Sequence, residues 1–175
     1  HACELLSKGT STQAGWGDLL AVDIGGATTD VYSMASGEPT VDNTMLKGLP
    51  EPWMKRTVEG DLGMRYSLTH VFEQIPGADN SENEYMQQVK AWVELCTAQP
   101  STLAAPGSEE EKLEEFLGRS AVSIAVERHC GRVADVFTPL GLMHTLEGKD
   151  LMCVPSVIGI GGVLRNSRRP EEILK

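Results

Sequence analysis

The sequence predicts an α/β domain: a mixed sheet with helices on both faces and a helical insertion. A short apolar run at 18–24 is closed by two glycines, which is typical of a buried strand. Alternating residues over 28–34 predict a second strand directly after it. Two later stretches, 82–96 and 108–136, carry apolar residues at helical spacing. Strands and helices within one chain of 175 residues favour the α/β class.

The first strands are expected to form an antiparallel meander. Turn-forming residues at 36–39 separate the second strand from a third, expected at 40–46. The following stretch, 48–63, is interpreted as a loop or short helical region. A last strand is predicted over 151–160, passing through a Gly-Gly pair into a short helix.

The longest helix is expected to begin after a Pro/Ser-rich break at 98–107. Ser108 and Glu111 have the spacing of a capping box, in which each side chain accepts from a backbone N–H of the first turn. We expect this helix to continue to Val136, with a kink at Gly118. Its acidic run, 109–115, predicts a solvated turn, and His129 is interpreted as a packing residue of the helix.

The chain is interpreted as one lobe cut from a longer protein, because it begins with His1 and not with Met. Residues 1–17 are expected to be an entry segment. A nucleotide-binding core is predicted from 18–66 and 117–175, with a helical insertion or subdomain at 67–116. A chain of this size can bury a core without a metal or disulfide.

The net charge of the chain restricts its expected partners, and the spacing of its cysteines indicates its compartment. A net charge of -10 repels phosphate backbones and anionic lipid, so nucleic acid and membranes are not expected as partners. Any phosphate ligand must be held by local N–H groups or a metal ion. The four cysteines are scattered without C-x-x-C spacing, which favours a reducing, cytoplasmic location and argues against a zinc site.

The segment 23–30, DIGGATTD, is typical of a loop that binds phosphate. Asp23 ends a buried strand and would place a carboxylate at the edge of the sheet. Gly25 and Gly26 permit positive φ and let a phosphate approach the backbone N–H groups. The remaining polar residues of the motif are Thr28, Thr29 and Asp30.

Carboxylates beside phosphates normally need Mg²⁺ between them, usually through water. We therefore expect a metal site at Asp23. The alternative is a β-hairpin with a Gly-Gly turn and polar strand residues. The pattern D-x-G-G-x-T-T-D after a strand is more specific than a loose glycine motif, which favours the phosphate interpretation.

A second motif, VIGIGGVLR at 157–165, lies at the junction of a strand and a helix. It is not the G-x-G-x-x-G dinucleotide fingerprint, because Leu164 stands at the last glycine and no strand follows. Gly161 and Gly162 would let a ring or ribose lie against the backbone, and Arg165 could stack on adenine. The alternative is a tight turn needed only for packing.

The two motifs, in this order, resemble the second phosphate loop and the adenosine loop of the actin, sugar-kinase and heat-shock-chaperone ATPases. In that superfamily both motifs lie in the second of two ribonuclease-H-like lobes. Three further segments, 57–65, 128–132 and 148–151, narrow the resemblance to the accessory (L-component, MutL) proteins of adenosylcobalamin-dependent glutamate mutase and ornithine aminomutase. The resemblance extends from about Asp18 to Leu174.

The resemblance implies a role for each matching residue. Asp23 would hold the water shell of Mg²⁺ and act in catalysis with Asp30. The phosphates of ATP or ADP would contact Gly25, Gly26, Thr28 and Thr29. The ribose would lie near Glu59, Gly60 and Asp61, and the adenosine would be bordered by Gly161, Gly162 and Arg165.

The sequence also departs from the superfamily. Ala27 stands where the chaperones have a third glycine, and the turn at 59–61 lacks one glycine. The first phosphate loop is not found in this sequence, so we expect it in an N-terminal lobe outside this chain. This chain alone is therefore expected to be inactive, although the parent protein is expected to be an ATPase.

The resemblance implies a parent protein that uses ATP to reactivate an adenosylcobalamin-dependent mutase, by opening it and exchanging a damaged cofactor. The expected partners are a nucleotide, the N-terminal lobe and a mutase subunit. Two alternatives stay open: a lobe of a small-molecule kinase or hydantoinase-like ATP-dependent hydrolase, and a non-hydrolysing structural lobe.

Overall fold

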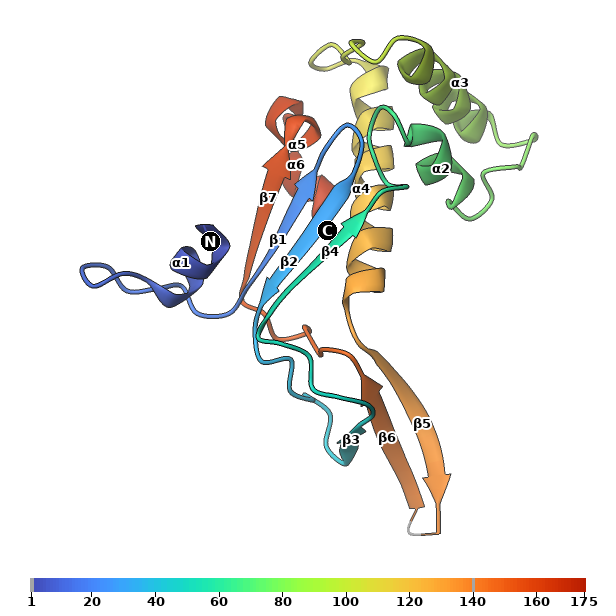
Figure 1. Ribbon diagram of the computed structural model, residues 1–175. Coiled ribbons are helices and arrows are strands. Elements are labelled where there is room, and N and C mark those ends of the chain that lie inside the picture. Colours follow the sequence, from blue (N-terminus) through green and yellow to red (C-terminus); the bar gives the residue numbers. More distant parts are fainter. Residues whose placement is uncertain (1, 140) are drawn as a thin grey trace. The chain divides into compact units, whose positions relative to one another are not determined.

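The computed structural model describes residues 2–139 and 141–175 and contains helices and two sheets (Figure 1). The helices are α1 (Ala2–Lys8), α2 (Leu68–Glu73), α3 (Glu84–Ala98), α4 (Glu109–His129), α5 (Gly162–Asn166) and α6 (Pro170–Ile173). The strands are β1 (Leu19–Ile24), β2 (Thr29–Met34), β3 (Thr44–Leu46), β4 (Met54–Glu59), β5 (Arg132–Thr138), β6 (Gly141–Glu147) and β7 (Ser156–Gly161). The predicted α/β class with a mixed sheet is confirmed.

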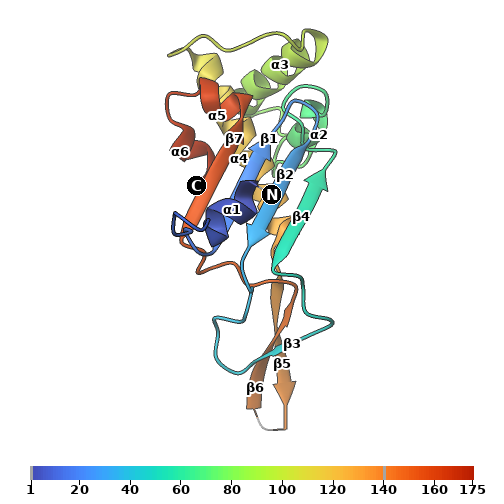
Figure 2. The same cartoon turned by 60° about the vertical axis from the view of Figure 1, so that its left-hand side comes forward.

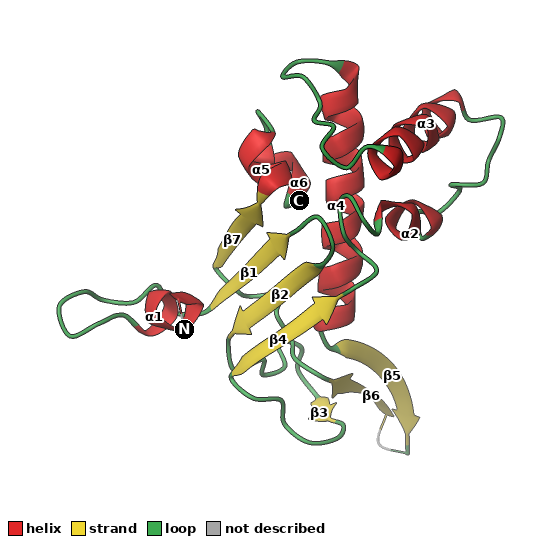
Figure 3. Cartoon of the chain, turned by 45° about the horizontal axis from the view of Figure 1, so that its top comes forward, coloured by secondary structure: helices red, strands yellow, loops and turns green. Residues whose placement is uncertain are grey.

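The first sheet has the strand order β4-β2-β1-β7. Figure 3 shows β2 running opposite to β1, while β7 runs in the same direction as β1. The apolar run of β1 is almost entirely buried, as the sequence predicts for a central strand. The strand beside β2 is β4, in a stretch interpreted as loop or short helix, and that interpretation is wrong. Exposure alternates along Met54–Glu59, but the less exposed side chains are Lys55, Thr57 and Glu59, so the sequence carries no apolar alternation that would indicate the strand.

The second sheet has the order β3-β6-β5 (Figure 2). β3 pairs in parallel with β6, with Thr44 opposite His144, and β5 pairs antiparallel with β6. The third strand of the predicted meander therefore belongs to another sheet. The helix predicted to reach Val136 ends at His129, because the segment Arg132–Thr138, which contains two valines and a threonine, forms a strand.

The chain divides into two compact units, and the boundary falls within every strand of the first sheet. One unit comprises His1–Ala21, Val31–Thr57 and Val126–Ile158. The other comprises Val22–Asp30, Val58–Ala125 and Gly159–Lys175. All the predicted site residues belong to the second unit.

A buried polar cluster lies within the first unit. His129 is fully buried, and its ring nitrogens lie 2.9 Å from the Ser33 and Thr57 hydroxyl oxygens. Burial, together with the nearby cations Lys55 and Lys149, lowers the pKa of His129 to about 4. The prediction of a packing histidine is confirmed.

The second unit contains the helices of the predicted insertion. Helices α2 and α3 pack on each other, and the Asn83 side chain caps α3 by accepting from two backbone N–H groups. The break before α4 is followed by half of the expected capping box. Ser108 Oγ accepts from the Glu111 N–H, but the Glu111 carboxylate accepts from Gly107 N–H and not from Ser108. Among the described residues, no helix is long and apolar enough to cross a membrane.

Helix α4 continues through Gly118 from Glu109 to His129. The glycine makes room for two neighbours, because a Cβ there would lie 3.1 Å from Val163 Cγ1 and 3.3 Å from Ile173 Cγ2. Close packing against the C-terminal helices therefore accounts for this residue.

Candidate functional site

The turn between β1 and β2 is held through its carbonyl groups. Gly25 N–H donates to Thr28 O at 2.8 Å and closes the hairpin. The Gly25 carbonyl accepts from Met64 N–H, and the Gly26 carbonyl accepts from the N–H groups of Arg65 and Tyr66. The carbonyls thus face the segment after β4.

Three backbone N–H groups of the same turn have no backbone acceptor among the described residues. The N–H groups of Gly26, Ala27 and Thr28 donate to no backbone carbonyl of the described residues. Gly26 and Ala27 are exposed and Thr28 is half-buried. Successive N–H groups without acceptors form a partly positive concavity that suits an anion.

The second motif lies directly against the end of β1. Gly161 has a φ of 119°, and a Cβ at this position would lie 2.2 Å from the Ile24 carbonyl oxygen. Only glycine fits such a contact and such a backbone. Around the neighbouring Gly162, a Cβ would meet nothing within 4 Å, so packing does not require a glycine there.

The two motifs line one pocket of about 180 Å³. Gly25 and Gly26 line it from the first motif, and Gly162 and Val163 line it from the second. Its other lining residues are Ile24, Met64, Arg65, Leu103, Glu114 and Asn166. Motifs that are separated by more than 120 residues in the sequence therefore meet around a single hollow.

Arg65 and Glu114 are pocket residues that sequence analysis missed. They form an ion pair, with Arg65 Nη2 donating to Glu114 Oε1. The prediction of a solvated acidic turn is wrong here, because Glu111, Glu114 and Glu115 are each less than 9% exposed. The i, i+3, i+4 spacing, which places these carboxylates on one helix face, is the signal that could have indicated their burial.

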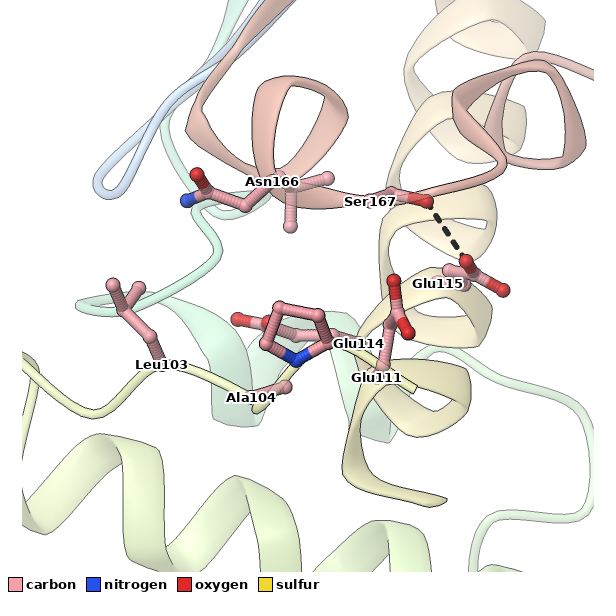
Figure 4. Close-up of a pocket in the computed structure, with 9 residues that line it drawn as sticks. Leu103, Ala104, Glu111, Glu114, Glu115, Asn166 and Ser167 are labelled. Atoms are coloured by element: carbon pink, nitrogen blue, oxygen red, sulfur yellow. Dashed lines mark hydrogen bonds between the residues drawn. The ribbon is translucent and has the colours of Figure 1, made fainter. Parts of the chain in front are cut away.

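A second hollow of about 300 Å³ shares Leu103, Glu114, Val163 and Asn166 with the first (Figure 4). On its far side, Ser167 Oγ donates to Glu115 at 2.8 Å. Glu111 accepts from the Gly107 N–H and, at 3.0 Å, from the Arg168 backbone N–H, and these two bonds hold the pKa of Glu111 below its usual value. The segment after α5 is thereby fixed to α4.

Arg165 lies elsewhere. It lines a third hollow of about 540 Å³ with Gly159, Gly161, Gly162, Leu164 and Pro170. Gly162 borders both this hollow and the 180 Å³ pocket. The structure thus brings Gly162, but not Arg165, into the pocket of the first motif.

The threonine and aspartate residues of the first motif differ in exposure. Thr29 is fully buried and donates to Leu62 O at 2.6 Å, so its hydroxyl ties the strand to the chain after β4. Asp30 is also buried, whereas Asp23 is half-buried near the end of β1. None of these three side chains lines the 180 Å³ pocket.

The predicted ribose turn lies next to the first motif without lining that pocket. The single Ser67 hydroxyl lies 2.9 Å from Gly60 O and 3.2 Å from Ala27 O, so the two carbonyl groups share its one hydrogen. Asp61 accepts from Gln74 Nε2 at 3.1 Å, and Glu59 ends β4. Within the described part of the chain, no three His, Cys, Asp or Glu side chains gather as a metal-binding group.

Both a protein family and a curated relative align with nearly all of this chain. The model of the family described as "MutL protein" matches residues 1–175. The chain is 44% identical over 177 aligned positions to "Protein MutL" of Clostridium tetanomorphum, covering 99% of this chain and 38% of that protein. The chain therefore spans less than half the length of this relative. No solved structure matches. Matched from its first residue to its last, the chain belongs to the MutL protein family.

Proposed function

We propose that this chain is the nucleotide-binding lobe of an ATP-dependent accessory protein that reactivates an adenosylcobalamin-dependent mutase. The observation that carries the nucleotide part is the meeting of the two glycine motifs around one pocket. The open N–H groups of Gly26, Ala27 and Thr28 suit the phosphates, and the exposed Gly162 leaves room for a flat group.

The chemistry of these residues fits a magnesium nucleotide. Mg²⁺, when bound with the nucleotide, would offset the phosphate charge that a chain of net charge -10 opposes. Asp23, half-buried near the end of β1, is the residue that would hold the ion through water. The buried hydrogen bond of Thr29 would keep the turn in shape.

The mutase part rests on family membership and on the resemblance of 57–65, 128–132 and 148–151 to mutase accessory proteins. In this proposal the ribonuclease-H-like lobe closes with an N-terminal lobe over ATP, and the closure is coupled to opening of the mutase. The substrate of the coupled step is the mutase with its damaged cofactor.

Isothermal titration of Mg-ADP into the chain tests the nucleotide part. A single lobe is expected to bind at about 0.1–1 mM, equivalent to about 4–5 kcal/mol. Gly162→Trp should abolish the heat by filling the pocket, whereas Leu49→Trp, at a site that is 93% exposed, should not. Unchanged binding by Gly162→Trp would contradict the placement of the nucleotide.

The mutase part is tested by measuring ATP hydrolysis with the full-length protein, with and without an adenosylcobalamin-dependent mutase. Stimulation by the mutase supports the proposal. Phosphorylation of a small molecule would favour the kinase alternative instead, and no turnover in either condition would favour a structural lobe.

A further inference from the structure

We propose that Arg65 supplies the positive charge which the pocket offers to the phosphates, and that Glu114 both positions this charge and weakens it. This inference rests on the proposed function, because it concerns the affinity of the same pocket. It assigns the two residues a role in setting how tightly an anionic ligand is held and how readily it leaves.

Arg65 is the cationic side chain of the pocket. The residues that line the 180 Å³ hollow include Arg65 and Glu114 but no other charged side chain. The adjoining hollow is lined by Glu111, Glu114 and Glu115 and by no cation. Arg168 and Arg169 pair with Glu111 and Glu115 of the adjoining hollow, so Arg65 is the cationic side chain that an anion meets in the lining of the 180 Å³ pocket.

Arg65 lies against the turn with the open N–H groups. Its own N–H donates to Gly26 O at 2.8 Å. The position that a Cβ of Gly26 would occupy is 3.8 Å from Arg65 Cβ and from Arg65 Cγ. The side chain therefore starts at the turn and continues along the wall of the pocket.

The guanidinium group is held at three points. Nη1 donates to Met64 O at 2.6 Å, and Nη2 donates to Thr102 O at 3.1 Å and to the Glu114 carboxylate. The Nε–H takes part in none of these bonds. The Arg65 side chain is 13% exposed and the Glu114 side chain 11%, so the pair is shielded from water on most sides but still borders the pocket.

A buried ion pair is a weak source of stability, because removing both charges from water opposes their attraction. Within the pocket, however, the pair has a clear electrostatic effect. Glu114 cancels much of the attraction that Arg65 exerts on a phosphate, and it keeps the guanidinium in one place. Two carbonyl groups would still hold that guanidinium if the charge of Glu114 were removed.

Glu114→Gln should therefore bind Mg-ADP more tightly, by about three- to tenfold at low salt, since glutamine keeps the acceptor oxygen and removes the negative charge. Arg65→Gln should bind it at least about tenfold more weakly, because Glu114 would then face the phosphates unpaired. The double variant, which is neutral at both positions, should lie between the two single variants.

The experiment measures the binding of Mg-ADP and of uncharged adenosine to these variants by isothermal titration at two salt concentrations. Glu109→Gln is the matched control, because it removes the same charge from the first turn of α4 at a side chain that is 78% exposed. The control should leave both affinities within about twofold of the unmodified chain, since exposed charges are strongly screened. Adenosine affinity should change little in any variant.

Several outcomes would overturn the inference. If adenosine and ADP affinities fall together in Glu114→Gln, the pair is structural only, while the nucleotide proposal stands. Equal ADP affinity in Glu114→Gln and in the unmodified chain leads to the same conclusion. If the unmodified chain binds no nucleotide, both the inference and the proposed function fail. Arg65→Gln leaves Glu114 as an unpaired charge and could fail to fold. The double variant has no unpaired charge, so its ADP affinity tests the inference in that case.

Discussion

Gly161 lies so close to Ile24 that a methyl group on Gly161 would be 2.2 Å from the Ile24 carbonyl oxygen. Gly161→Ala must move the backbone of β1 and also place alanine at a φ of 119°. We expect this substitution to lower the free energy of unfolding by about 2–4 kcal/mol. Chemical denaturation monitored by circular dichroism measures the change.

The neighbouring glycine is the matched control for that experiment. Gly162→Ala adds a methyl group where nothing lies within 4 Å, at the first position of α5. Its free energy of unfolding should stay within about 0.5 kcal/mol of the unmodified chain. Equal destabilisation at both positions would contradict the contact between Gly161 and Ile24.

A second pair of glycines, Gly60 and Gly63, tests how the segment after β4 packs against the turn at Ala27. A Cβ at Gly63 would lie 2.3 Å from the Ala27 carbonyl carbon, whereas a Cβ at Gly60 would meet nothing within 4 Å. Gly63→Ala should cost about 2–3 kcal/mol of stability, and Gly60→Ala should cost less than about 1 kcal/mol. If thermal unfolding shows equal losses, the Ala27 turn does not pack on Gly63 as described.

Thr29 is expected to contribute to stability through one buried hydrogen bond. Thr29→Val keeps the shape of the side chain but leaves the Leu62 carbonyl without its donor. The expected loss is about 1–3 kcal/mol, measured by urea denaturation. Thr29→Ser keeps the hydroxyl and should retain most of the bond's contribution, so a serine variant as unstable as the valine variant would argue against this role.

The stability of the chain should fall in mild acid because of His129. Its pKa is about 4 when folded and about 6.5 in a model peptide, so between these values the unfolded chain binds more protons. Its contribution is therefore complete above pH 6.5 and lost as the pH falls toward 4. The loss amounts to at most roughly 3 kcal/mol.

Urea denaturation between pH 4 and 8 checks this pH dependence. His129→Gln removes the titrating group and should flatten the slope between pH 4 and 6.5. His70→Gln, at an exposed residue of α2, is the control and should leave the slope unchanged. A steep slope that persists in His129→Gln would assign the acid sensitivity to other groups.

Local pattern alone was sufficient for the elements that carry the candidate site. Each of these elements is specified by residues that are neighbours in the sequence. They are the apolar run of β1 with its Gly-Gly turn, the alternation of β2, and the glycine junction of β7 and α5. The two glycine motifs can be recognised in the sequence for the same reason. Helix α3 was also anticipated, because its apolar residues repeat at the helical period.

Tertiary structure decided the partners and environments of those elements. β3 joined β6 rather than β2, because strand pairing depends on residues about 100 positions away. The carboxylates of Glu111, Glu114 and Glu115 look like a solvated run, yet Arg65, Arg168 and Arg169 pair with them and permit their burial. The sequence by itself therefore determined which segments form the two glycine motifs. The packing of distant segments decided which side chains meet in the pocket, because burial and pairing of charge arise only when the chain is folded.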